Sequence, residues 1–125
     1  MQRRFRLSRS EDFKRVRRTG KSYAHPLVVL VAQANETGRL RIGIAAGKAV
    51  GGAVQRNRSK RLLREAMRAF IPSISTQQAQ DTAPSWDLIL IARPALLSSS
   101  LTDIRSALAN LLRRAGLPAR DKLSQ

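Results

Sequence analysis

The alternation of apolar and polar residues along the chain predicts three β-strands. Residues 27–32 form an uninterrupted aliphatic run, and residues 39–44 alternate so that one face of the strand is hydrophobic. Residues 86–92 are apolar on both faces, which is typical of a strand covered from both sides. A turn-like stretch joins the first two strands, so we expect them to pair as an antiparallel hairpin. Tyr23 marks a candidate position for a short extra strand.

Helical periodicity predicts three helices. The first, at about residues 8–19, begins with capping-box spacing and ends before Gly20, where a left-handed backbone is often required. The second, at about residues 53–71, is stopped by Pro72. The third, at about residues 101–115, carries an amphipathic, leucine-rich stripe and is followed by glycine and proline.

The segment of residues 73–85 is rich in Ser, Thr, Gln and Ala, so we expect an exposed, mobile loop. The element order is then α-β-β-(β)-α-β-α within a single domain of residues 1–125. This order predicts an α+β fold, a two-layer α/β sandwich in which one small sheet carries the helices on one face.

The charge of the chain narrows its function. Its 125 residues include 24 Lys and Arg against 8 Asp and Glu, which gives a formal net charge of +16. Residues 1–21 hold nine basic and two acidic side chains. Residues 48–68 hold seven basic side chains and one acidic side chain. Two concentrated basic segments in a small domain predict a surface for a polyanion. Nucleic acid is the expected partner, and an anionic membrane surface is the alternative.

Other residue types exclude several kinds of chemistry. The chain has no cysteine and a single histidine, His25, which excludes disulfides, thiolate metal sites and histidine clusters. No apolar run approaches the roughly 20 residues that span a bilayer, and charged residues interrupt the N-terminal region. No two carboxylates pair on a core strand, as a metal-dependent nuclease needs. We therefore expect a cytoplasmic protein that is not itself catalytic and binds no metal through its side chains.

The predicted helix at residues 53–71 has two chemically distinct sides. On a helical wheel, the apolar side chains that would pack on the sheet are Leu62, Leu63, Ala66, Met67 and Phe70. The basic side chains form a ridge on the polar side, namely Arg56, Lys60, Arg64 and Arg68, extended by Arg58 and Arg61. Basic neighbours four residues apart repel each other, and only Glu65 relieves them. This ridge suits a sugar-phosphate backbone, because arginine and lysine bind phosphate oxygens.

Residues 53–66 read AVQRNRSKRLLREA and closely resemble the signature of the bacterial ribonuclease P protein subunit, A-V-x-R-N-R-x-K-R-x-x-R-E. The segments that begin at Glu11, Arg41 and Asp87, reading EDFKRV, RIGI and DLILIAR, are similar to the family in order and spacing. The resemblance covers roughly residues 5 to 115.

The resemblance implies that one copy of the protein pairs with one large catalytic RNA. The holoenzyme would remove the 5′ leader from precursor tRNA, with catalysis supplied by the RNA and its bound Mg²⁺ ions. The signature helix and the preceding loop would bind the catalytic RNA. In this family the connection from the central strand through the signature helix is an unusual left-handed βαβ crossover, where pattern reasoning alone assigns a right-handed one. The positions that we expect to contact the catalytic RNA are Lys48, Arg56, Asn57, Arg58, Lys60, Arg61 and Arg64, with Arg68 added from the ridge.

The resemblance further implies a cleft for the single-stranded leader between the first helix and the sheet, lined by Phe13. This sequence departs from the family there, because Arg17 and Val31 occupy positions that often hold aromatics. The loop at residues 45–49 also lacks one lysine. Base stacking on aromatics is worth about 1–3 kcal/mol per base. We therefore expect the leader to depend more on charge, from Arg17 together with Arg39 and Arg41.

Several alternatives stay open at this point. Phe13 is either a cleft residue or a core residue, and the two strand arginines are either leader contacts or ordinary exposed side chains. Asp87 helps to bind a metal near the RNA, acts as a cap, or pairs with an arginine. A non-enzymatic ribosomal or RNA-chaperone protein is the alternative function. A DNA-binding module is disfavoured, because helix-turn-helix spacing is absent from the sequence.

Overall fold

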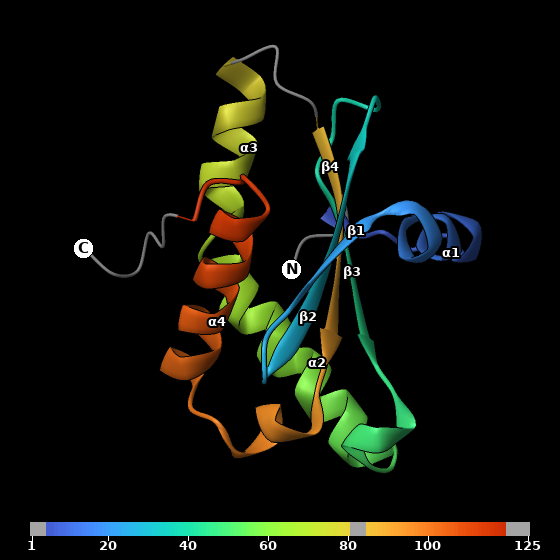
Figure 1. Ribbon diagram of the computed structural model, residues 1–125, viewed down its shortest axis with the longest axis vertical. Helices are drawn as coiled ribbons and strands as arrows, with labels where there is room; N and C mark the ends of the chain where they lie inside the picture. Colours follow the sequence, from blue (N-terminus) through green and yellow to red (C-terminus); the bar gives the residue numbers. More distant parts are fainter. Residues whose placement is uncertain (1–4, 81–84, 120–125) are drawn as a thin grey trace.

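Four strands form one sheet in the order β1-β2-β4-β3 (Figure 1). The computed structural model describes residues 5–80 and 85–119 of the chain. The strands are β1 (Lys21–Ala24), β2 (Val28–Asn35), β3 (Arg41–Ala46) and β4 (Ser85–Ala92). Strand β4 pairs antiparallel with β2 and parallel with β3. The predicted hairpin between β2 and β3 is therefore wrong, because β4 lies between them, whereas the short strand at Tyr23 is confirmed as β1.

Strand β4 occupies this central position because it is apolar on both faces. Leu88, Ile89 and Leu90 have no exposed surface, although successive side chains of a strand point to opposite sides of the sheet. Only a strand covered from both sides buries both sets, so the prediction from its sequence is confirmed. The hairpin prediction failed because it used the short distance in sequence between β2 and β3, and β4 competes for the same strand edges.

The helices lie on both sides of the sheet (Figure 1). The longer ones form a layer on one face, in agreement with the predicted α+β sandwich. The expectation that all helices share that face is wrong for α1, which crosses the opposite face and contacts β2 and β4. The elements are α1 (Ser10–Thr19), α2 (Ala53–Arg68), α3 (Ile71–Gln80) and α4 (Leu101–Arg114), with short 3-10 helices η2 (Lys48–Val50) and η3 (Pro94–Ser98).

A separate hydrophobic cluster fills each side of the sheet. The larger one lies between the sheet and helices α2 and α4, and it contains Leu30 and Leu90. The smaller one lies beneath α1, and its buried members are Leu7, Val16, Val31 and Ile89. Val16 is the one fully buried side chain of α1. Because burying a large aliphatic side chain stabilises by only about 1.5–3 kcal/mol, apolar packing holds α1 less firmly than it holds α2 or α4.

The segment after α2 differs from the expected loop. Helix α2 ends at Arg68, and Pro72 lies in the first turn of α3, where its missing N–H and fixed φ are tolerated. Residues 73–80 are therefore helical, and Ile74 is fully buried. The remainder of the expected loop, residues 81–84, lies outside the described residues, and residue 85 already belongs to β4. The proline that we expected to end one helix begins another.

Gly20 ends α1 for a reason different from the expected one. The helix begins after Arg9 without a side-chain cap, so the predicted capping box is absent, and the φ of Gly20 is −74°, which is not left-handed. A Cβ at Gly20 would lie 2.6 Å from the Val16 carbonyl oxygen and 2.8 Å from Cγ1 of Val31. Glycine is required here because the end of α1 approaches β2 closely.

Replacing Gly20 with alanine is expected to lower the free energy of unfolding by about 1–3 kcal/mol, because the added methyl forces α1 away from β2. Urea denaturation measures this change. Gly47→Ala is the matched control: nothing lies within 4 Å of a Cβ at that position. Its stability should change by less than about 0.5 kcal/mol. Equal losses in the two variants would contradict a specific close approach at Gly20.

Candidate nucleic-acid interface

Helix α2 separates its apolar and basic side chains much as its sequence predicts. Its buried residues are Ser59, Leu63, Ala66 and Met67, and Phe70 beyond its end is 1% exposed. Leu62, which was expected on the packed side, is only half-buried. Ser59 tolerates burial because its hydroxyl donates a hydrogen bond to the Arg56 carbonyl at 2.8 Å. The opposite side of the helix carries the basic ridge.

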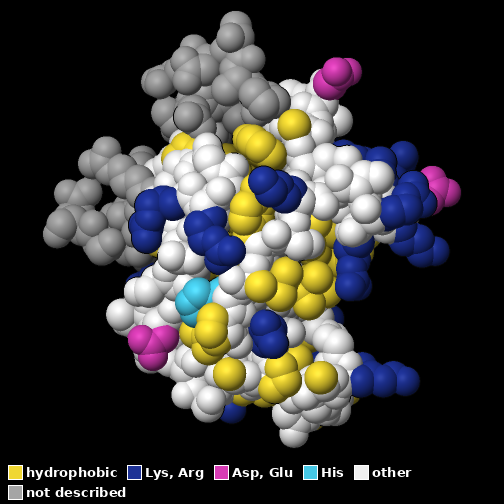
Figure 2. Space-filling model, viewed as in Figure 1, with side chains coloured by type: hydrophobic (Ala, Val, Ile, Leu, Met, Phe, Trp, Pro, Cys, Tyr) yellow, Lys and Arg dark blue, Asp and Glu magenta, His cyan; other side chains and the backbone are white. Residues whose placement is uncertain are grey.

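The ridge lacks nearby negative charge. Arg58, Arg61 and Arg68 are exposed, and the other ridge members, Arg56, Lys60 and Arg64, are half-buried. The one ion pair on α2 among the described residues joins Arg68 to Glu65 at 3.4 Å, and both side chains are solvent-exposed. Exposed pairs of this kind contribute about 0–1 kcal/mol. Basic side chains are spread over the face shown in Figure 2 and acidic ones are few. The ridge is therefore an uncompensated cationic surface.

Lys48 extends this surface at the N-terminal end of α2. It is exposed and begins η2 directly after β3, and η2 contacts α2. The chain then reaches α2 through Gly51, whose φ of 137° lies in a region that side-chain-bearing residues avoid. The positive end of the helix dipole adds to the charge of Lys48. The loop lysine and the signature helix thus form one continuous basic region.

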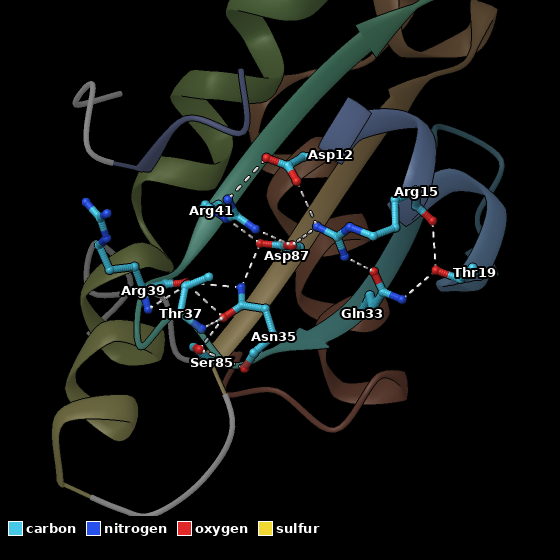
Figure 3. A network of polar contacts seen from close by, with 10 residues as sticks. All are labelled: Asp12, Arg15, Thr19, Gln33, Asn35, Thr37, Arg39, Arg41, Ser85 and Asp87. Atoms are coloured by element: carbon cyan, nitrogen blue, oxygen red, sulfur yellow. Dashed lines mark hydrogen bonds and ion pairs between the residues drawn. The ribbon is translucent and has the colours of Figure 1, made fainter. Parts of the chain in front are cut away.

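A second group of polar side chains surrounds Asp87 on the face of the sheet that α1 crosses (Figure 3). The Asp87 carboxylate is fully buried and accepts two hydrogen bonds from the guanidinium of Arg41, each 2.8 Å long. Arg15 of α1 donates to the same carboxylate at 2.9 Å, and the Asn35 amide donates at 2.6 Å. All strong acceptor positions of this carboxylate are thereby used, so the burial of its charge is compensated.

The group continues beyond Asp87 and connects α1 to three strands. Asp12 lies 3.3 Å from both guanidiniums, those of Arg15 and Arg41. Arg15 also donates to the Gln33 side chain on β2, and Gln33 in turn donates to the Thr19 hydroxyl. We call the set Asp12, Arg15, Thr19, Gln33, Asn35, Arg41 and Asp87 the Asp87 network.

The charges of the Asp87 network balance. Burial acts to raise the pKa of Asp87, but hydrogen bonds from Arg41, Arg15 and Asn35 outweigh it and lower that pKa below its ordinary value. Hydrogen bonds to Asp87 raise the pKa of both arginines. Of the alternatives for Asp87, arginine pairing is confirmed. Within the described residues, no group of three or more His, Cys, Asp or Glu side chains is placed to hold a metal ion.

The five residues expected in the leader cleft do not form one surface. Phe13 is half-buried and its ring fills the space above Gly43, where a Cβ would lie 2.8 Å from the ring. Arg17 is exposed and follows Phe13 by four residues, so both lie on one flank of α1. Val31 is 3% exposed beneath the helix and offers no accessible side chain. Arg41 belongs to the Asp87 network, on the other flank of α1.

The remaining expected residue, Arg39, is exposed in the turn before β3, and its carbonyl accepts a hydrogen bond from Asn35. It lies at the end of the sheet where the Asp87 network is found. The flank of α1 with Phe13 and Arg17 instead faces the opposite end of β3 and β4. There the register places Val29 and Ala45 beside Ile91, and all three are half-buried.

Sequence reasoning missed Arg93 at this end. It is exposed and follows β4 directly, and because β3 and β4 are parallel, it shares a sheet edge with the residues that precede η2. A basic residue immediately after a buried strand was the available signal. Arg93, Lys48 and the start of α2 therefore lie at the same end of the sheet as Ala45 and Ile91.

Replacing Asp87 with asparagine is expected to destabilise the fold by about 1–3 kcal/mol at pH 7, less than for a fully buried pair because both guanidiniums reach solvent. An unfolded aspartate titrates near pH 4, and the native pKa is lower, so the contribution is complete above about pH 4. It disappears as the pH falls through the native pKa. Denaturation of both proteins between pH 7 and pH 2 measures the difference.

The exposed Glu36 provides the control, because Glu36→Gln removes a carboxylate that lies outside the Asp87 network. Its unfolding free energy should follow that of the wild type within about 0.5 kcal/mol across this range. A constant difference between wild type and Asp87→Asn down to the lowest pH would show that the Asp87 charge contributes nothing.

Comparison with known proteins places the chain in a family. The family model described as Ribonuclease P matches residues 1–116. The ribonuclease P protein component of Herpetosiphon aurantiacus is 39% identical over 117 residues, which cover 94% of this chain and 89% of that protein. The protein of the same name from Clostridium botulinum is 37% identical over 112 residues, which cover 90% of this chain and 95% of that one.

Solved structures share the fold. The RNase P protein of Staphylococcus aureus has a TM-score of 0.70 and 28% identity, covering 90% of this chain and 96% of that chain. The RNase P protein of Thermotoga maritima has a TM-score of 0.69 and 27% identity, covering 90% and 97%. The sheet with helices around it, the signature on α2 and these similarities agree, and the chain therefore belongs to the ribonuclease P protein family.

Proposed function

We propose that the chain is the protein component of ribonuclease P, a tRNA-processing ribonucleoprotein enzyme, and that α2 binds the catalytic RNA. The observation that supports this most directly is the basic ridge, because it coincides with the family signature and is left without carboxylates along most of its length. Arginine forks bind phosphate oxygens in pairs. Asn57 is exposed between two arginines and suits a base edge or a 2′-hydroxyl. Lys48 continues the contact at the helix N-terminus.

The 5′ leader of precursor tRNA is the second proposed ligand, held on the flank of α1 that carries Phe13 and Arg17. An aromatic ring and a free guanidinium beside a half-buried apolar strip suit single-stranded RNA, which binds by stacking and by charge. Arg41 acts indirectly in this proposal, because its guanidinium is held by Asp87 and Asp12. Arg39 remains a candidate contact at the edge of this region, and Val31 supports α1 from beneath.

The reaction itself is assigned to the RNA. A protein acid or base needs a titratable group that is free to exchange a proton with the substrate. Asp12 and Asp87 lie on the flank of α1 opposite the proposed leader surface, and both accept hydrogen bonds from arginines. This pair also fits a Mg²⁺ ion poorly, because two guanidiniums already occupy the site. Mg²⁺ is expected to act through bound RNA, and one protein is expected per catalytic RNA.

The proposed site of action is the cytoplasm, where tRNA precursors are processed. In the part of the chain that the structure describes, none of the helices combines the length and the apolar character that crossing a bilayer requires. The uncompensated basic ridge is instead suited to a polyanion of fixed shape, such as a folded RNA.

Reconstitution with the cognate ribonuclease P RNA is expected to restore 5′ maturation of precursor tRNA at a magnesium concentration too low for the RNA alone. The physical reason is that bound cationic side chains replace part of the magnesium that screens RNA and substrate. Cleavage of labelled precursor measures the effect. A synthetic polycation of equal charge is the control, and equal stimulation by it would favour the non-enzymatic RNA-chaperone alternative.

Arg61→Ala and Arg64→Ala are expected to weaken binding to the catalytic RNA. Each should reduce the slope of log affinity against log salt by about 0.7–0.9 for each phosphate that the variant no longer neutralises. Binding measured over a series of salt concentrations gives the slopes. Arg113→Ala on α4 removes an exposed arginine that is not part of the ridge and should leave the slope unchanged. The same slope for all three variants would place the RNA surface elsewhere.

A further inference from the structure

The Asp87 network lies along one flank of α1, opposite the flank proposed to hold the leader. Successive helical residues are separated by about 100°, so Asp12, Arg15 and Thr19 fall on one side of Val16, and Phe13 falls on the other. The polar flank faces the ends of the strands where Asp87 and Gln33 are register partners. Figure 3 shows Arg15 reaching from α1 to both side chains.

Apolar packing alone defines the position of α1 poorly. Val16 is its one fully buried side chain, and the ring of Phe13 rests on Gly43, which provides no side chain to interlock with it. Hydrophobic contacts are non-directional, so a short helix on a small apolar cluster can shift sideways at little cost. A buried carboxylate is different, because losing a partner leaves an uncompensated charge. The ion pairs therefore supply the directional constraint.

Within the network, Arg15 is the movable connection and Arg41 is the fixed one. Arg41 lies beside Asp87 in the β3–β4 register and belongs to the sheet itself. Arg15 is the residue of α1 that binds Asp87 directly, and it also binds Gln33 on β2. Its side chain is 36% exposed, against 23% for Arg41. Removing Arg15 would end the contact of α1 with Asp87 while leaving Asp87 paired with Arg41. The Asp12–Arg41 pair and the hydrogen bond from Gln33 to Thr19 would remain, so the position of α1 would loosen without the helix being released.

We propose that Asp87 is a positioning residue for the leader site and that it acts through Arg15. The pair fixes the lateral position of α1 on the sheet and thereby fixes the distance from Phe13 and Arg17 to the strip formed by Val29 and Ile91. Neither Asp87 nor Arg15 touches the leader. This inference rests on the proposed function, because it concerns the same leader surface.

The test uses holoenzymes assembled from full-length protein and the cognate RNA. Arg15→Gln and Asp87→Asn should each weaken binding of a precursor tRNA with a long leader by about tenfold, comparable to losing one stacked base. A substrate with a single leader nucleotide should change by less than about twofold, as should protein affinity for the RNA. The double variant should be no weaker than Asp87→Asn alone, because both changes remove the same contact.

Arg18→Gln is the matched control: it removes one positive charge from the same helix at an exposed position outside the Asp87 network. A loss for Arg15→Gln no greater than that for Arg18→Gln would overturn the inference. So would an equal loss for long-leader and short-leader substrates, because a general defect would move both. Arg15→Gln keeps the Arg41–Asp87 pair, so this arm remains decisive if Asp87→Asn folds poorly.

Hydrogen exchange in the free protein separates this inference from the proposed function. Arg15→Gln should speed amide exchange in α1 severalfold relative to Arg18→Gln and leave β4 unchanged, whatever the ligand is. Unchanged α1 exchange would overturn the positioning role even if the leader effect were present. A different outcome would contradict the proposed leader surface itself, and with it the role of Asp87 there. In that outcome, α1 exchange differs between Arg15→Gln and Arg18→Gln as expected, but precursor tRNA binding by the wild-type holoenzyme does not depend on leader length.

Discussion

Strand β4 must be covered on both faces, and the arrangement of the other elements follows from this constraint. Its apolar side chains alternate between the two sides, so the layer of α2 and α4 satisfies only half of them. Helix α1 covers the other half although it is short and strongly basic. Asp87 is the third residue of the same strand and pairs with Arg41 and Arg15. One strand therefore determines both the second hydrophobic cluster and the polar network beside it.

Basic side chains are paired with carboxylates in the Asp87 network but are mostly unpaired on α2. Acidic residues are scarce in this chain, and two of the eight, Asp12 and Asp87, lie together in the network under α1. There they neutralise Arg15 and Arg41 and fix them in place. On α2 the single described pair is exposed and weak, so the ridge keeps its positive charge. Two carboxylates thus neutralise basic side chains in the Asp87 network, whereas Glu65 alone accompanies the basic ridge of α2, the surface proposed to bind RNA.

Local sequence predicted those features that depend on local physics. The type of the long strands and of α1, α2 and α4, the two sides of α2, and the strand buried on both faces follow from periodicity, whereas most of α3 was expected to be a loop. The order of strands could not be predicted in this way, because pairing depends on which distant strand best fills the centre of the sheet. The start of α3 at Pro72 was missed because the same residue is compatible with the end of one helix and the first turn of another.

The candidate site was predictable to a similar extent. The basic ridge needed only a helical wheel, whereas the roles of Arg41 and Val31 needed the tertiary structure. From the sequence alone, Arg41 is interpreted as a free strand arginine. The β3–β4 register shows that Asp87 lies beside it. From the sequence alone, Val31 is interpreted as a position in the leader cleft that lacks an aromatic. The structure shows that it is buried beneath α1. Both depend on contacts between segments far apart in sequence.

The close approach at Gly20 determines how near α1 lies to β2. Cγ1 of Val31 occupies the space in which a Cβ at Gly20 would lie, so the end of α1 rests directly on β2. A larger aromatic at position 31 would have to displace the helix that carries Phe13. A small strand residue therefore permits a low position for α1, and that position brings Arg15 within reach of Asp87. Val31 therefore supports a helix whose position the Arg15–Asp87 pair then defines.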